Sequence, residues 1–145
     1  MTKYLSCFSA IMWFAASVTA ADVYTNPEDV AARCVDEVQT IDRRVTTAIS
    51  DETQRCVGII QRLVANNRHE AARQVARDCI EHARTKVRAA TLEIQNLCDR
   101  CTGWLVDLGL YKLARRVNSV CEDTIDGFSV LLSRQEEVLR NALRG

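Results

Sequence analysis

Proline and glycine are scarce in this chain: Pro27 is the only proline, and five glycines are scattered over 145 residues. A phosphate-binding loop needs several glycines close together, so no nucleotide site of that kind is expected. Because proline and glycine punctuate turns, their scarcity also favours long uninterrupted helices over a fold of many short strands.

Aromatic residues and excess charge are also lacking. Phe, Trp and Tyr make up 6% of the chain, which is little material for a pocket of stacked rings. The 19 basic and 19 acidic residues balance, whereas a nucleic-acid-binding protein usually carries a basic excess on one face. We therefore expect no nucleic-acid partner.

The first 20 residues have the order of an export signal. Lys3 precedes an apolar run over residues 4–16, and the small residues of Val18-Thr19-Ala20 follow. The run is shorter than the ~20 residues that a membrane-spanning helix needs, so no transmembrane span is expected. We expect cleavage after Ala20, which leaves residues 21–145 as a single secreted or periplasmic domain.

Cleavage would also remove Cys7 and leave an even number of cysteines. The remaining six are Cys34, Cys56, Cys79, Cys98, Cys101 and Cys121. In an exported protein of this size, six cysteines most naturally form three disulfides.

Apolar residues recur at steps of three and four after residue 26, and no alternation typical of strands competes. The pattern predicts helices at about residues 27–66, 68–108 and 110–144. Asn26-Pro27 suits a helix start, Asn67 and Gly109 suit helix ends, and Asn67 with Glu70 has the spacing of a capping box. The expected fold is all-α: an elongated antiparallel three-helix bundle running up, down and up.

The core is expected to follow these apolar positions with coiled-coil-like spacing. Ser50 and Gly127 are the two points where a helix could break or kink. At Gly127 the reason is that glycine inside a helix costs ~1 kcal/mol relative to alanine. On the second helix the main seam comprises Val75, Cys79, Ala83, Val87, Ala90, Ile94, Leu97, Cys101, Trp104 and Leu108. On the third helix it includes Tyr111, Ala114, Val117, Cys121, Ile125, Phe128, Leu131, Leu132, Val138, Leu139 and Ala142.

The two fold-back points select one disulfide pairing out of fifteen. In an antiparallel helix pair, two residues that lie level with each other are equally far from the turn in sequence. The turns fall near Asn67 and Gly109. This rule uses each cysteine once and pairs Cys34 with Cys101, Cys56 with Cys79, and Cys98 with Cys121. Facing Cα atoms of packed helices lie roughly 3.4–5.4 Å apart, close to the ~4.4–6.8 Å that a disulfide needs.

The sequence also resembles itself, which suggests duplication of a helix–turn–helix unit. Cys56-Val57-Gly58 recurs as Cys101-Thr102-Gly103, and Ala72-Arg73 ahead of Cys79 recurs as Ala114-Arg115 ahead of Cys121. In this alignment the second copy has a connection three residues shorter.

No motif of catalysis or metal binding stands out. Cys98-Asp99-Arg100-Cys101 is a C-x-x-C, but redox pairs usually sit at a helix N-terminus and zinc needs further ligands nearby. His69 and His82 are ~20 Å apart along one helix and cannot share a metal. Neighbouring acids on the helices could be read as catalytic pairs, but we interpret them as solvated surface charge: Asp36-Glu37, Asp51-Glu52, Glu122-Asp123 and Glu136-Glu137. We expect no enzyme activity, no metal and no cofactor.

The functional hypothesis is an exported, disulfide-stapled interaction or structural module that binds a protein or cell-envelope partner through a helix face. The alternative is a small secreted carrier of apolar ligands. An internal cavity of several hundred Å³ would favour the carrier, and a filled interior would favour the interaction module.

Overall fold

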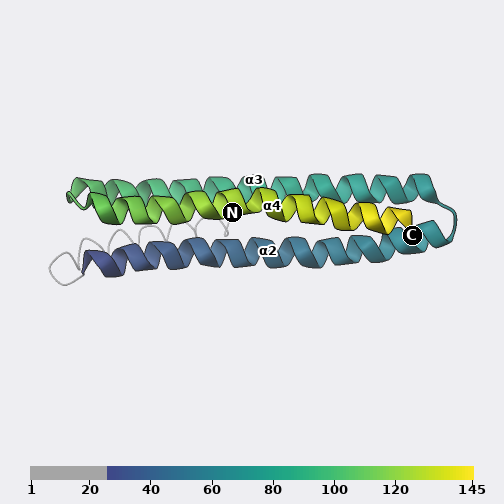
Figure 1. Ribbon diagram of the computed structural model, residues 1–145, viewed down its shortest axis with the longest axis horizontal. Coiled ribbons are helices and arrows are strands. Elements are labelled where there is room, and N and C mark those ends of the chain that lie inside the picture. The colour runs from purple at the N-terminus through teal and green to yellow at the C-terminus, as the bar shows by residue number, and fades with distance from the viewer. Residues whose placement is uncertain (1–25) are drawn as a thin grey trace, which may run out of the picture.

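A computed structural model describes residues 26–145, so the predicted export signal lies outside the described residues. Three helices account for nearly all of this part of the chain: α2 (Pro27–Ala65), α3 (His69–Asp107) and α4 (Tyr111–Arg144). They run side by side as a long rod (Figure 1), with α2 and α4 parallel and α3 antiparallel to both. The predicted all-α three-helix bundle is confirmed.

The helices are continuous, and their bounds lie within one residue of the expected ranges. Neither Ser50 in α2 nor Gly127 in α4 interrupts its helix. At the start of α2, the side-chain oxygen of Asn26 accepts a hydrogen bond from the Glu28 amide at 3.0 Å, and Pro27 occupies the first helical turn. Asn26 therefore acts as the expected cap, because it satisfies one of the amides that a helix start leaves unpaired.

Both turns have the same backbone arrangement. The amide of Arg68 donates to the Leu63 carbonyl at 2.8 Å, and the amide of Leu110 donates to the Leu105 carbonyl at 2.8 Å. The residue before each donor, Asn67 or Gly109, has a positive φ, of 58° and 75° respectively. This is the Schellman arrangement, in which a left-handed residue lets the chain fold back at once.

The predicted capping box at the start of α3 is wrong. Arg68 is the residue that precedes α3, and no side chain caps that helix start. Asn67 takes the left-handed position that ends α2. Glu70 instead accepts hydrogen bonds from the Arg73 guanidinium, one of them at 2.7 Å, because an arginine three positions later lies on the same helix face.

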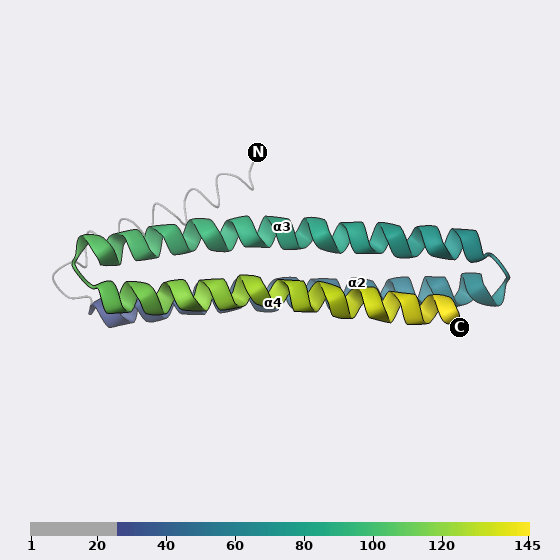
Figure 2. The same ribbon diagram turned by 45° about the horizontal axis from the view of Figure 1, so that its top comes forward.

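The interior is packed by aliphatic side chains from all three helices, and Figure 2 shows α2 and α4 lying side by side beneath α3. The largest side chains with almost no exposed surface are Phe128, Ile49, Ile60, Ile94, Leu105 and Leu139. Each such burial stabilises the fold by about 1.5–3 kcal/mol. The core divides into a longer cluster and a shorter one, the latter near the α2–α3 turn.

Some positions depart from the expected seams. Leu108, Tyr111 and Val138 are 51%, 58% and 44% exposed. Leu108 follows the last residue of α3 and Tyr111 is the first residue of α4, so both lie at the end of the rod, where the described helices cover them least. Leu139 takes the core position beside Val138, and the polar Thr53 of α2 is buried.

The helices begin at even intervals, at residues 27, 69 and 111, which are 42 positions apart. Equal spacing follows from the shape, because antiparallel helices of one rod span the same length. The two turns are likewise equivalent at an offset of 42, with Leu63 matching Leu105 and Asn67 matching Gly109. The Cys56 to Cys101 match in the sequence implies an offset of 45 and so differs from the structural equivalence. The duplication itself stays a prediction.

Candidate functional site

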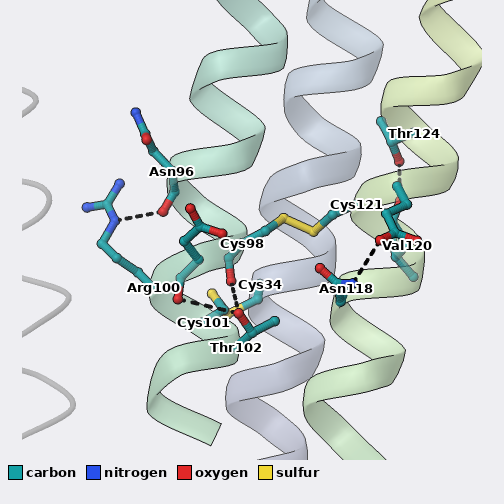
Figure 3. The surroundings of a disulfide bond; sticks show 12 residues. Cys34, Asn96, Cys98, Arg100, Cys101, Thr102, Asn118, Val120, Cys121 and Thr124 are labelled. Atoms are coloured by element: carbon teal, nitrogen blue, oxygen red, sulfur yellow. Dashed lines mark hydrogen bonds between the residues drawn. A yellow bond between two sulfur atoms is a disulfide. The ribbon is translucent and has the colours of Figure 1, made fainter. Parts of the chain in front are cut away.

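Three disulfides tie the helices together in the pairs that the fold-back rule selects. Cys34–Cys101 joins α2 to α3, Cys56–Cys79 joins the same two helices, and Cys98–Cys121 joins α3 to α4, with Cα separations of 6.5, 6.6 and 6.5 Å. Figure 3 shows the part of this framework where Cys98 and Cys101 of α3 bond to two different helices, through Cys121 and Cys34. Two of these bonds start from adjacent turns of α3, and the third lies farther along the rod, toward the α2–α3 turn.

The C-x-x-C sequence of α3 follows from this geometry. Cys98 and Cys101 lie three positions apart on the helix, which turns them ~60° from each other about its axis. Cys98 bonds to α4 and Cys101 to α2. The Thr102 hydroxyl donates to the Cys98 carbonyl at 2.7 Å (Figure 3). Each sulfur of the motif thus holds a different helix, which explains the motif without redox or zinc chemistry.

The two histidines lie in different surroundings. His69 is exposed at the first position of α3, whereas the Nδ1 atom of His82 contacts the Glu52 carboxylate of α2. The Lys86 ammonium donates to the other oxygen of Glu52 at 2.8 Å. Within residues 26–145, no group of three or more His, Cys, Asp or Glu side chains is placed to hold a metal ion.

Opposing effects act on the Glu52 carboxyl. Partial burial raises its pKa, but hydrogen bonds from Lys86 and His82 and the charges of those groups outweigh burial, so the pKa lies below its ordinary value. The carboxylate is therefore held ionised between Lys86 and His82 of α3. This arrangement stabilises the α2–α3 contact.

Ion pairs also bridge the helices elsewhere. Arg44 of α2 meets Glu93 of α3 at 2.7 Å, and Arg84 of α3 meets Glu136 of α4 at 2.7 Å. All interhelical ion pairs within the described part of the chain involve α3. Among the described residues no ion pair bridges α2 and α4, although charged side chains such as Asp42 and Arg134 line their boundary.

Two open hollows lie along that boundary, and we call the surface that contains them the α2–α4 groove. One open hollow of about 540 Å³ lies between Asp42 of α2 and a stretch of α4 that includes Val130 and Arg134. A second, of about 300 Å³, lies between Val57 of α2 and Val138 of α4. Val130 and Val138 are 52% and 44% exposed. Two apolar side chains therefore face solvent along one groove.

A second apolar surface lies at the end of the rod where α3 turns into α4. We call Val106, Leu108 and Tyr111, with the half-buried Leu110 between them, the α3–α4 tip. The first three are 43%, 51% and 58% exposed. Sequence reasoning missed this surface because it assigned Leu108 and Tyr111 to the core. The signal that identifies it is the run of apolar residues Leu108-Gly109-Leu110-Tyr111 in a turn that requires none.

Comparison with known proteins gives no family for this chain: no family model, curated protein or solved structure matches it. None of the described helices combines the length and the apolar character needed to cross a bilayer.

Proposed function

We propose that this protein is an exported interaction or structural module that binds a protein or cell-envelope partner along the α2–α4 groove. Export by a cleaved leader over residues 1–20 would deliver it to a secreted or periplasmic location. Three disulfides and the lack of a spanning helix in residues 26–145 are compatible with an oxidising compartment.

The observation that carries the proposal is the contrast between the three helix boundaries. Ion pairs bridge α2 to α3 and α3 to α4, while the α2–α4 boundary leaves Val130 and Val138 exposed beside open hollows. A helix of the partner lying in this groove would bury its own apolar side chains between α2 and α4. The disulfide framework would keep the groove preorganised, which lowers the entropy cost of binding.

The alternative, a carrier of apolar ligands, has less support. A carrier needs an enclosed apolar cavity that covers most of its ligand. The hollows beside Val130, Tyr111 and Val138 are open to solvent, and large aliphatic side chains such as Ile49, Ile94 and Leu105 are buried between the helices.

A photo-crosslinking amino acid placed at Val130 in cells of the source organism tests the proposal. A control carries the same amino acid at Leu92, which is 61% exposed on α3. We expect a discrete adduct from position 130 only, and expect Val138→Glu to abolish it, because a charge would be buried at the same groove. Adducts that are the same from both positions, or none from position 130, would refute the groove as the binding face.

A further inference from the structure

Two oppositely charged residues of α4, Asp123 and Arg134, line the larger hollow of the α2–α4 groove. Both are exposed, and neither takes part in an ion pair among residues 26–145. About three helical turns separate them, which is ~16 Å along the axis. Because this distance is too long for a contact within one chain, each charge is available to a partner of the opposite sign.

Val130 and Gly127 lie between these two charges. Val130 is 52% exposed, and Gly127, one turn before it, has no side chain. A methyl group at Gly127 would meet no atom within 4 Å, so packing within the rod does not require this helix-weakening residue. Together with Asp123 and Arg134, the two residues follow steps of four, three and four, and such positions share one helix face. Another helix is therefore able to approach α4 closely at Gly127.

The order of these four residues is self-complementary. Asp123 lies four positions before Gly127, and Arg134 lies four positions after Val130. A two-fold axis midway between Gly127 and Val130 places Asp123 of one copy opposite Arg134 of the other. The same axis places Val130 opposite Gly127, and each of these contacts occurs twice. An antiparallel pair of chains thus matches charge with charge at both ends and an apolar side chain with open space at the centre.

The other charges near the hollow are compatible with this axis. Asp42 of α2 accepts a hydrogen bond from the Thr46 hydroxyl at 3.3 Å. Since α2 and α4 begin at the same end of the rod, Asp42 lies closer along the axis to Asp123 than to Arg134, and it extends the acidic part.

On α4 itself, the next charged residues of this face are Arg116, Asp126 and Glu137. By the two-fold symmetry they meet uncharged residues of the other copy, namely Asn141, Leu131 and Val120. The axis therefore brings none of these like charges together.

The axis also suits the shape of the molecule. The midpoint between Gly127 and Val130 lies close to the middle of α4. Because α2 lies beside α4 (Figure 2), two rods related by this axis would overlap along nearly their whole length. Such an overlap maximises the area that two copies bury against each other, and a stable interface needs a large buried area.

We propose that the partner of the α2–α4 groove is a second copy of this chain, bound antiparallel across α4. Asp123 of each copy pairs with Arg134 of the other, and Val130 packs against Gly127. This inference rests on the proposed function, because it names the partner of the same groove. Exposed ion pairs around a small apolar centre give a weak, reversible dimer, so we expect dissociation in the micromolar range.

Sedimentation velocity of the exported protein across micromolar concentrations tests the proposal. Asp123→Arg and Arg134→Asp each make both charge pairs of the dimer repulsive, so each should raise the dissociation constant at least about tenfold. An equimolar mixture of the two variants restores both attractive pairs. We therefore expect the mixture to dimerise as readily as the parent protein, a rescue that misfolded variants would not show.

A matched control makes the result specific. Asp99→Arg changes the net charge as Asp123→Arg does, but at an exposed position of α3, and it should leave the dimer unchanged. A parent protein that stays monomeric at every concentration would overturn the proposal. So would an equal loss in Asp99→Arg, or a mixture of the two variants that stays monomeric.

The photo-crosslink at position 130 separates this inference from the proposed function. An adduct with twice the mass of the chain supports both. An adduct of any other mass, with a monomeric parent protein, overturns the second copy and leaves the groove as the binding face of another partner. The absence of any adduct refutes the groove itself and, with it, both proposals.

Discussion

The disulfide between Cys98 and Cys121 gives the most direct test of the architecture. Both cysteines are buried, with 4% and 3% of their surfaces exposed. Their bond closes a segment with a sequence separation of 23. Loop-closure entropy assigns such a bond about 3 kcal/mol of stability at 25 °C. We therefore expect Cys98→Ala to lower the free energy of unfolding by about that amount, with a small addition for the cavity.

A double-mutant cycle separates the bond from the two side chains. Cys98→Ala, Cys121→Ala and the double variant should each lose roughly 3 kcal/mol, because each breaks the same bond once. The coupling energy between the two sites should then be about 3 kcal/mol. Urea unfolding without reductant measures all four proteins, and peptide mapping without reduction identifies the bonded pairs.

A mismatched pair provides the control. Cys56→Ala and Cys98→Ala break different disulfides, so their losses should add in the double variant. If instead the losses of Cys98→Ala and Cys121→Ala added, these two cysteines would not be bonded to each other. Peptide mapping that found Cys98 joined to Cys101 would refute the pairing and, with it, the position of the second turn.

Three other substitutions test the core, the Glu52 cluster and α4. Leu105→Ala should cost about 2–5 kcal/mol and Leu108→Ala less than about 0.5 kcal/mol by urea unfolding, because only Leu105 is buried; similar costs would contradict the packing. Because the pKa of the Glu52 carboxyl is lower in the folded protein, the ionised carboxylate stabilises the fold at pH values above its ordinary pKa of 4.5. This stabilisation is lost as the pH falls through the lower pKa of the folded state. Glu52→Gln should therefore be less stable than the parent at pH 7, with the difference shrinking below about pH 4.5 in pH-dependent thermal unfolding; a constant difference would count against the cluster. Gly127→Ala should raise the free energy of unfolding by about 1 kcal/mol, because alanine is the better helix former and its methyl group would meet no atom within 4 Å. A lower free energy of unfolding would mean that α4 needs glycine at this position.

The sequence alone determined the helices and the pairing of the cysteines. Local features were enough: Asn26 and Pro27 for the first start, Asn67 and Gly109 for the two ends, and an apolar period of three and four in between. With the turns located, level positions in an antiparallel pair follow from arithmetic on residue numbers. This reasoning works here because uninterrupted helices joined by tight turns leave little other freedom in the register.

Only the tertiary structure decided which apolar residues are covered and which helix boundaries are bridged by ion pairs. Periodicity assigned Leu108, Tyr111 and Val138 to the core, but coverage depends on where the neighbouring helices end and which side they occupy. The same holds for the ion pairs, since Glu52 meets His82 and Lys86 only because α2 and α3 are in one particular register. The exposed tip and the α2–α4 groove depend on several helices at once, and a pattern along one helix does not contain that information.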